Sequence, residues 1–327
     1  MDRTIKWGVI APGNISNSFA EGMKEVLNSE ICAVASRDLN RAEAFAKKFG
    51  IEKTYGSYEA IMRDEEVDAV YIATPNPYHK EISIMGLNHK KAVLCEKPAV
   101  LNLKELGEVI RTAEENKTFY MEAMWTKFLP VMKEVKRIIS EGRIGEIRMV
   151  KADFCFRAPF DAESRLYKRE LGGGALLDVG VYTIAFACDM LGKDPSYIKG
   201  FGDIGRSGVD EQDSAILGYE DGKFAALSFA ISTETEHNAY VYGTEGYIKL
   251  PQFWRAREAV LVRNGEEQVI RPDFKGNGYN YEVEEVNRCL RAGKVQSDRM
   301  SWNHSREVIS IMDELRRQWK LVYPGEE

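Results

Sequence analysis

The chain lacks long apolar runs and has no excess of positive charge. No segment approaches the roughly 20 consecutive apolar residues that cross a bilayer, so we expect no membrane partner. The 327 residues carry a formal net charge of −6. A nucleic-acid surface needs a concentrated excess of Lys and Arg, so we expect no nucleic-acid partner either.

The sequence is also poor in patterns that bind metal or form disulfides. Its four histidines are not spaced as metal ligands, and its five cysteines include no C-x-x-C pair. These counts indicate reduced thiols and no metal site. The first residues lead directly into a strand-like segment without the apolar region of a signal peptide, so we expect a cytoplasmic protein.

Length and rhythm predict two domains, because 327 residues are many for one hydrophobic core. Over residues 1–125, short apolar segments alternate with helical ones, which is typical of a Rossmann-like, doubly wound parallel sheet in the α/β class. The predicted strands are Lys6 to Ala11, Ile31 to Ser36, Ala69 to Ala73, Ala92 to Cys95 and Thr118 to Met121.

Residues 126–327 follow a different rhythm. A long strand at Ile147 to Phe156 and a helix at Ala175 to Leu191 precede several strands between Ile198 and Ile270 with no helix among them. Turn signals such as Asp221-Gly222 separate these strands. We expect an α+β domain with a large, mostly antiparallel open sheet for substrate binding and dimerisation, whose last helix can pack back on the first domain.

The first strand–helix junction carries a degenerate dinucleotide fingerprint. In G-x-G-x-x-G turns, glycines allow a tight turn and let the backbone approach a pyrophosphate at the helix N-terminus. Here only the middle glycine, Gly13, is present, with Ala11 and Ser16 at the outer positions and Asn14 and Ile15 between. A plain turn without a ligand explains the pattern as well, but its place in the chain favours a cofactor.

The end of the second strand bears on which cofactor is bound. An acid there accepts hydrogen bonds from the ribose of NAD, whereas this chain has Ser36 and Arg37. A hydroxyl and a guanidinium suit a 2′-phosphate, so NADP is preferred over NAD. Asp38 keeps NAD open, and a surface arginine with no ligand is the alternative.

The ends of the third and fourth strands carry further candidate residues, because ligands of open α/β sheets bind at the carboxyl ends of strands. Thr74, Asn76 and His79 follow the third strand, although His79 can also be an ordinary helix residue. Glu96 and Lys97 follow the fourth, before Pro98. A lysine offers a proton and a positive charge to a carbonyl or alkoxide oxygen, and a surface charge pair is the alternative.

In the second domain, a run of three glycines, Gly172 to Gly174, leads into a helix with Asp178 and Tyr182. Residues four apart share a helix face, so both side chains can point toward one site. A carboxylate beside a phenol that relays a proton would complement Lys97. A glycine turn followed by a helix with a core tyrosine is the alternative.

Together these motifs resemble the Gfo/Idh/MocA family of oxidoreductases over nearly the whole chain. Within it, the segment Glu122 to Pro130 and the tyrosine at position 182 are most similar to the branch of dihydrodiol dehydrogenases and NADP-dependent xylose dehydrogenases. Ala11 departs from the glycine fingerprint, and Lys127 stands where relatives often have arginine.

The resemblance implies roles for the candidate residues. Lys97 would polarise the reacting oxygen, Tyr182 would be the acid/base, and Asp178 would position it or accept a substrate hydroxyl. The implied cofactor-binding residues are Ala11, Gly13, Asn14, Ile15, Ser36, Arg37, Thr74, Asn76, His79, Glu96, Lys97 and Trp125. The implied substrate contacts are Trp125, Phe156, Arg157 and Tyr167. Relatives commonly dimerise through the open face of the second sheet, so we expect a homodimer.

The predicted function is reversible oxidation of a secondary hydroxyl on a sugar, polyol or cyclic diol, with the hydride passing to NAD(P). One alternative is a relay enzyme that retains its nicotinamide, or a reductase of the biliverdin type. A non-catalytic dinucleotide sensor is another, but a sensor has no need of Lys97, Asp178 and Tyr182 together.

Overall fold

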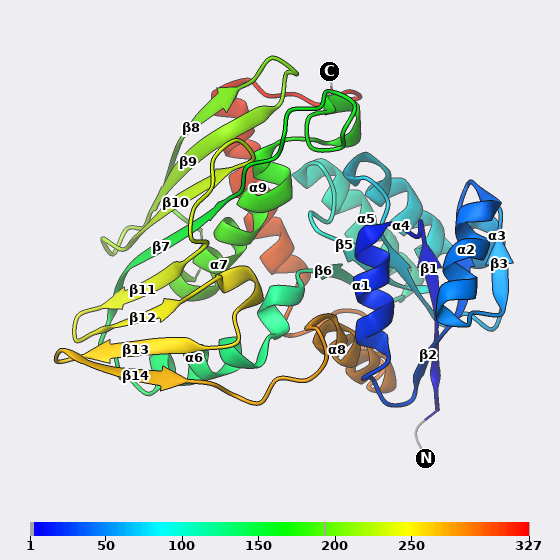
Figure 1. Ribbon diagram of the computed structural model, residues 1–327, viewed down its shortest axis with the longest axis horizontal. Helices are drawn as coiled ribbons and strands as arrows, with labels where there is room; N and C mark the ends of the chain where they lie inside the picture. Colours follow the sequence, from blue (N-terminus) through cyan, green and yellow to red (C-terminus); the bar gives the residue numbers. More distant parts are fainter. Residues whose placement is uncertain (1–2, 193, 327) are drawn as a thin grey trace. The chain divides into compact units, whose positions relative to one another are not determined.

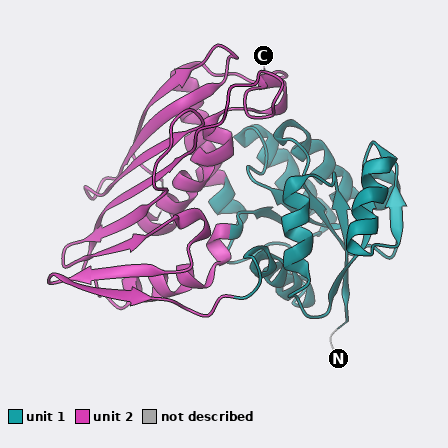
Figure 2. Cartoon of the chain, in the orientation of Figure 1, with its two compact units in different colours: residues 1–125, 275–305 teal, residues 126–274, 306–327 magenta. Residues whose placement is uncertain are grey.

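The computed structural model describes residues 3–192 and 194–326. The chain folds into two compact units (Figure 2), the first made of residues 1–125 and 275–305 and the second of residues 126–274 and 306–327. Each unit is built around its own sheet.

The first unit contains six parallel strands in the order β3-β2-β1-β4-β5-β6 (Figure 1). They are β1 (Ile5–Ile10), β2 (Ser29–Ala35), β3 (Lys53–Tyr55), β4 (Ala69–Ile72), β5 (Ala92–Glu96) and β6 (Tyr120–Ala123). This order confirms the predicted doubly wound sheet, and it reverses direction between β1 and β4, where such folds bind dinucleotides.

Helices cover this sheet on both faces. They are α1 (Asn14–Met23), α2 (Leu39–Phe49), α3 (Tyr58–Met62), α4 (His79–Asn88), α5 (Leu103–Asn116) and α8 (Tyr279–Arg291). Helix α1 packs against α8, whereas α3 and α5 pack against α4. Every residue of β4 and β5 is buried, as expected for strands covered on both sides.

Strand β3 was not among the strands predicted from the sequence. It has three residues, all half-buried, and lies at the edge of the sheet beside β2. So short an edge strand contains no apolar run, and only its pairing with Ala33 to Ala35 of β2 defines it.

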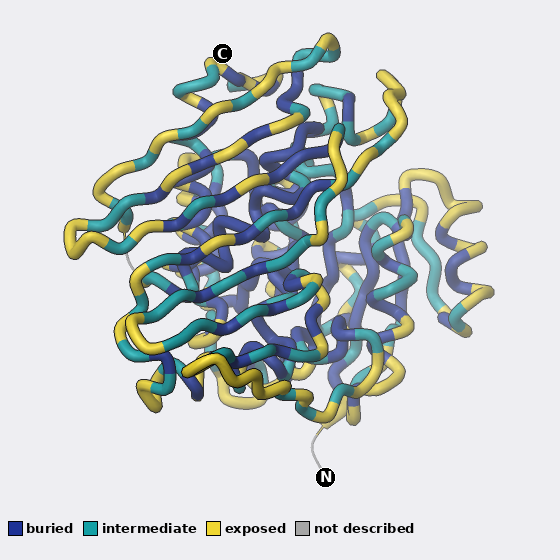
Figure 3. The backbone as a smooth tube through the Cα atoms, turned by 60° about the vertical axis from the view of Figure 1, so that its left-hand side comes forward, coloured by how far each residue is buried: buried dark blue, intermediate teal, exposed yellow. Residues whose placement is uncertain are grey.

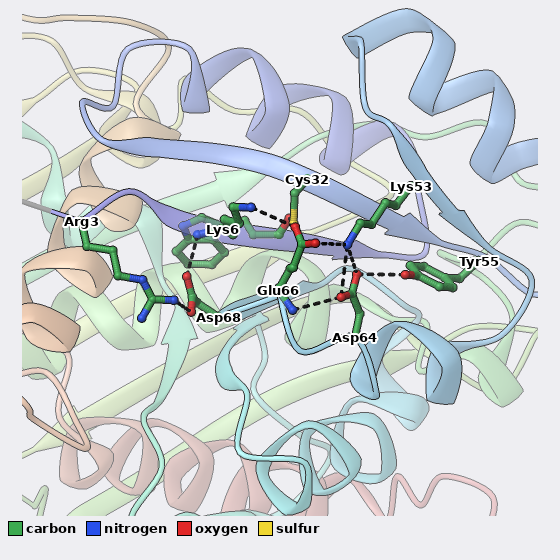
Figure 4. Close-up of polar contacts among 9 residues, drawn as sticks. Arg3, Lys6, Cys32, Lys53, Tyr55, Asp64, Glu66 and Asp68 are labelled. Atoms are coloured by element: carbon green, nitrogen blue, oxygen red, sulfur yellow. Dashed lines mark hydrogen bonds and ion pairs between the residues drawn. The ribbon is translucent and has the colours of Figure 1, made fainter.

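A polar network stabilises the side of this sheet where β1, β3 and β4 begin (Figure 4). Its ion pairs are Lys53–Asp64 (3.0 Å), Lys6–Glu66 (2.9 Å) and Arg3–Asp68. Tyr55 also donates its hydroxyl to Asp64 at 2.9 Å. The network connects β1 and β3 to the loop before β4. The predicted cofactor residues follow the carboxyl ends of the strands, at the opposite edge of the sheet.

The second unit contains an eight-stranded sheet in the order β14-β13-β12-β11-β7-β10-β9-β8. Its strands are β7 (Ile147–Cys155), β8 (Tyr197–Ile204), β9 (Asp210–Gly218), β10 (Phe224–Ala230), β11 (Ala239–Gly243), β12 (Tyr247–Leu250), β13 (Ala259–Arg263) and β14 (Glu266–Ile270). Neighbours are antiparallel except β7 and β10. The predicted mostly antiparallel sheet is therefore confirmed.

One face of this sheet is open (Figure 3). Along β9, Ala215 and Leu217 are buried while Ser214 and Ile216 are exposed, which is the alternation of a sheet covered on one side. The helices outside the first unit's set are α6 (Pro130–Ser140), α7 (Val181–Leu191) and α9 (Trp302–Trp319). Helix α7 packs on β7 and β10.

The predicted helix from Ala175 to Leu191 has an irregular start. A π-helical turn, Leu176–Gly180, precedes α7. A Cβ atom at Gly180 would lie 2.8 Å from the Phe229 ring of β10, so glycine permits this close approach. The segment Arg169–Leu191 is long and apolar enough to span a membrane, but 89% of its most apolar window is buried within the protein, as in a core helix.

Candidate active site

The turn between β1 and α1 has room for a phosphate. Ala11 adopts a left-handed φ of 63°, the conformation for which glycine is favoured, and its carbonyl accepts hydrogen bonds from Gly13 N (2.8 Å) and Ser16 Oγ (3.1 Å). Gly13 precedes α1, and within the described chain no side chain caps this helix. A Cβ atom at Gly13 would meet nothing closer than 4.0 Å. The amides of Asn14 and Ile15 therefore begin a helix suited to an anion.

The end of β2 separates the two candidate ribose-binding groups. Asp38 accepts a hydrogen bond from Asn40 N at 3.0 Å and so caps α2. Ser36 is buried, and its hydroxyl accepts from Asp38 N at 3.2 Å. Arg37 is exposed, with its guanidinium carbon 5.4 Å from the centre of the Tyr78 ring. Both residues are exposed, but Asp38 is engaged in capping α2, whereas Arg37 lies beside the Tyr78 ring.

The loop after β4 contains a buried hydroxyl without a partner. Thr74 is 7% exposed, and its Oγ1 has no hydrogen-bond partner among the described residues. A nearby ligand would satisfy this group, since buried hydroxyls are nearly always hydrogen-bonded. Asn76 follows in a short 3₁₀ turn. His79 begins α4 fully buried, and its ring nitrogens lie 2.8 Å from the carbonyl oxygens of Thr74 and Pro98.

Lys97 leaves the end of β5 beside a buried carboxylate. Tyr71 donates its hydroxyl to Glu96 Oε1, and the backbone N–H of Lys97 donates to Glu96 Oε2 at 3.3 Å. Glu282 of α8 is fully buried, and burial together with the charge of Glu96 raises its pKa well above the usual value. The Lys97 side chain is half-buried and its peptide bond to Pro98 is cis.

Trp125 is held in place by stacking on Tyr279 of the same unit. The ring centres are 4.7 Å apart with the planes at 14°, and only 4% of Trp125 is exposed. Such a stack fixes the orientation of the indole. Tyr279 was not among the residues predicted from the sequence, because it is more than 150 positions later and no local motif marks it.

In the second unit, a buried acid anchors the helix that carries Asp178 and Tyr182. Asp210 of β9 accepts a hydrogen bond from the Leu176 backbone N–H at 2.5 Å. A Cβ atom at Gly174 would collide with the same carboxylate, which accounts for glycine at this position. The anchor therefore sets the position of the first turn of the helix. The Asp178 carboxylate itself pairs with Arg165, 2.9 Å away.

An aromatic cluster centred on Phe154 includes Tyr182 within the second unit. Its members are Phe154, Phe156, Tyr182, His237 and Trp254. Phe154 lies at its centre, 5.5 Å from the Tyr182 ring and stacked on Trp254 at 5.2 Å. His237 Nε2 lies 2.7 Å from the carbonyl of Cys155, and its Nδ1 accepts from the Trp254 indole at 3.4 Å. The wall beside Tyr182 is therefore apolar and fixed in position.

The predicted substrate contacts occupy different environments. Phe156 belongs to the aromatic cluster, and Arg157 is exposed beside it in the chain. Tyr167 is 3% exposed and donates its hydroxyl to the Ala158 carbonyl at 3.0 Å, so this hydroxyl already has a partner.

Each unit thus brings together part of the predicted set. The first carries the candidate cofactor residues at the carboxyl ends of β1, β2, β4 and β5. In the second, Tyr182 and Phe156 both lie against Phe154, whereas Asp178 pairs with Arg165. Sequence reasoning missed Phe154, Trp254 and Tyr279. They come from β7, the 3₁₀ turn Phe253–Arg255 and α8, which are far apart in the chain, and only the fold makes them neighbours of predicted residues.

Comparisons with known proteins agree with this arrangement. Residues 5–124 match the model of the oxidoreductase family with an NAD-binding Rossmann fold, and residues 132–249 match the Gfo/Idh/MocA C-terminal domain. A trans-1,2-dihydrobenzene-1,2-diol dehydrogenase of Danio rerio is 37% identical over 329 residues, covering 98% of both chains. The enzyme of that name from Homo sapiens is 33% identical, with the same coverage.

A solved 3-ketoreductase from Actinomadura kijaniata, in complex with NADP and TDP-benzene, is 26% identical. The match covers 96% of this chain and 98% of that one, with a TM-score of 0.86. The family models and the relatives thus cover both units, and the two matched domains follow each other in the order of the two sheets observed here. The chain therefore belongs to the Gfo/Idh/MocA family and is a nicotinamide-dependent oxidoreductase.

Proposed function

We propose that the protein oxidises a secondary hydroxyl of a cyclic trans-diol with NADP, and reduces the corresponding carbonyl in the reverse direction. The observation that carries the proposal is the aromatic cluster, in which Phe154 lies beside the ring of Tyr182 and Trp254 stacks on Phe154. A flat carbocyclic ring packs well on such a wall while its hydroxyls remain free for polar groups. The substrate named for the relatives above, a dihydrobenzene diol, has this shape.

The oxidation removes a hydride and a proton from the substrate. A hydride leaves the carbon, and the bound nicotinamide supplies its acceptor. A proton leaves the hydroxyl through Tyr182, while the Lys97 ammonium stabilises negative charge on the reacting oxygen. Asp178 accepts a hydrogen bond from the neighbouring hydroxyl, which explains a preference for diols. Trp125, fixed by Tyr279, forms a wall for the nicotinamide.

The test is an NADP-dependent activity panel with trans-1,2-dihydrobenzene-1,2-diol and D-xylose. We expect faster oxidation of the diol, and a loss of about 10²- to 10⁴-fold in kcat for Tyr182→Phe because the proton relay is removed. Tyr58→Phe, on a half-buried tyrosine of α3, is the matched control and retains full activity. Trp254→Ala raises KM for the diol more than for xylose if the aromatic wall selects carbocycles.

Other outcomes separate the alternatives. Turnover of xylose but not of the diol identifies a sugar dehydrogenase. Activity that needs no added nicotinamide, with dinucleotide retained through purification, identifies a relay enzyme. Nucleotide binding without turnover of either substrate favours a sensor.

We also propose that NADP is preferred over NAD. Asp38 is occupied in capping α2, whereas the exposed guanidinium of Arg37 can form a fork to a 2′-phosphate. NADPH and NADH titrations followed by tryptophan fluorescence test this preference. Arg37→Ala abolishes it, and Arg41→Ala, an exposed arginine on α2, leaves it unchanged. Equal affinity of the wild type for both nucleotides contradicts the proposal.

A second copy of the chain is the proposed partner of the open sheet face. Phe201 of β8 is 67% exposed and Tyr197 56%, and three tyrosines (Tyr240, Tyr242 and Tyr247) pack side by side on β11 and β12. Apolar side chains over so wide a sheet favour an interface between subunits. Light scattering should show a dimer that Phe201→Asp weakens. Leu27→Asp, at an 85% exposed leucine of the first unit, is the control.

A further inference from the structure

The peptide group that joins Pro98 to Ala99, directly after Lys97, is held at both ends. Its carbonyl oxygen lies 2.8 Å from His79 Nδ1, and its N–H donates to Glu122 Oε1 at 3.0 Å. All of these atoms belong to the first unit. The two side chains come from α4 and β6, so elements on either side of β5 in the chain converge on one peptide group.

His79 connects this peptide to a second loop. Its ring is completely buried, and Nε2 lies 2.8 Å from the Thr74 carbonyl after β4. A carbonyl oxygen only accepts, so a neutral imidazole donates to one of the two carbonyls and a protonated one donates to both. Burial lowers the pKa of His79, whereas the hydrogen bonds to these carbonyls oppose that shift. In either state the ring fills the space between the loops after β4 and β5.

Glu122 is fixed in the same manner on the other side. The side chain lies at the carboxyl end of β6 and is 1% exposed. Its second oxygen accepts a hydrogen bond from the Ser305 hydroxyl at 2.5 Å. A buried carboxylate with both oxygens engaged has little freedom to rotate, so the Ala99 N–H meets a stationary acceptor.

We infer that His79 and Glu122 are positioning residues that act through Lys97. By holding the Pro98–Ala99 peptide, they set the direction in which the Lys97 side chain leaves the end of β5. The inference rests on the proposed role of Lys97. A displacement of about 1 Å in a group that contacts the reacting atoms costs on the order of 100-fold in rate, so the hold on this peptide matters more for kcat than for substrate binding.

The main experiment places His79→Leu in two backgrounds, the wild type and Lys97→Met. In the wild type we expect kcat for the diol to fall about 10- to 100-fold, with KM changing less than about threefold. In Lys97→Met, which has already lost the lysine, His79→Leu should cause no further loss. A residue that only supports the fold would lower the residual rate by the same factor in both backgrounds, and that result would overturn the inference.

Two further variants guard against misfolding. His79→Gln retains a donor in place of the imidazole and should recover part of kcat, whereas Glu122→Ala should lower kcat as His79→Leu does. His89→Gln is the matched control. His89 directly follows the last residue of α4, and its Nδ1 likewise lies near a backbone carbonyl, that of Met85, at 2.9 Å. It should leave kcat unchanged.

The outcomes also separate this inference from the proposed function. A wild-type protein without NADP-dependent oxidation of the diol refutes the proposed function. Full activity in Lys97→Met refutes the role of Lys97 and the positioning inference with it. An active wild type, an impaired Lys97→Met and an unimpaired His79→Leu refute the positioning inference alone.

Discussion

The buried acid pair in the second unit gives a quantitative prediction about pH. Asp213 is 4% exposed on β9, and its carboxyl group is buried near that of Asp210, which anchors the helix bearing Asp178 and Tyr182. Two buried carboxyl groups so close together repel each other when both are ionised, so we expect them to share a proton. Burial and the neighbouring Asp210 charge raise the pKa of Asp213 to about 11.

The sign of the effect follows from proton binding. Near pH 7 to 9 the folded protein keeps this proton, whereas an unfolded aspartate, with a pKa of about 4, has lost it. The folded state therefore binds more protons, and its stability falls as pH rises. One proton changes the folding equilibrium about tenfold per pH unit, which is roughly 3 kcal/mol between pH 7 and 9.

Asp213→Asn replaces the shared proton by an amide hydrogen that does not titrate. We expect the free energy of unfolding of the wild type to fall relative to this variant by roughly 3 kcal/mol between pH 7 and 9, measured by urea unfolding at each pH. Asp273→Asn, on an exposed aspartate of the same unit, should follow the wild type. Parallel curves for the wild type and Asp213→Asn would refute the shared proton.

Two further predictions concern packing and charge in the same unit. Gly180→Ala places a methyl group 2.8 Å from the Phe229 ring and should lower the free energy of unfolding, measured in urea, by about 1–3 kcal/mol. Gly107→Ala, at an open and exposed position of α5, should instead raise the free energy of unfolding by up to about 1 kcal/mol. Equal effects of the two substitutions would contradict the packing argument. Lys127→Ala leaves the buried Asp189 carboxylate without its closest cation and should lower the free energy of unfolding by about 3–5 kcal/mol. Lys136→Ala removes a half-exposed lysine 3.3 Å from the same carboxylate and should lower the free energy of unfolding by less than about 1 kcal/mol in the same assay.

Much of the fold was predictable because its strands are distinct in the sequence. The buried strands β4 and β5 are continuous apolar runs, which a parallel sheet covered on both faces requires. Strand β3 was missed because three half-buried residues at an edge leave no such signal. The π-helical turn before α7 was missed because the local sequence has the pattern of an ordinary helix. The packing of its last residue, Gly180, on Phe229 involves a strand some 50 residues later.

The residues of the candidate site were likewise predictable only in part. Motifs at strand ends, such as Glu96 with Lys97, were visible because the parallel topology collects those ends at one edge. Phe154 and Trp254 were not, since about 100 residues separate them and their stacking exists only in the folded sheet. The sequence favoured Arg37 over Asp38 as the ribose-side group, and the hydrogen bond from Asn40 to Asp38, which the sequence does not show, is consistent with that preference.

His79 shows most clearly how the two kinds of information differ. The sequence places it soon after a strand, where a ligand contact and an ordinary position at the start of a helix are both possible. The fold buries the ring and sets its nitrogens against carbonyls 5 and 19 residues away. A side chain that joins the loops after β4 and β5 constrains both of them. The effect of His79→Leu on kcat in the Lys97→Met background therefore shows how His79 acts. No further loss indicates that His79 acts only by positioning Lys97.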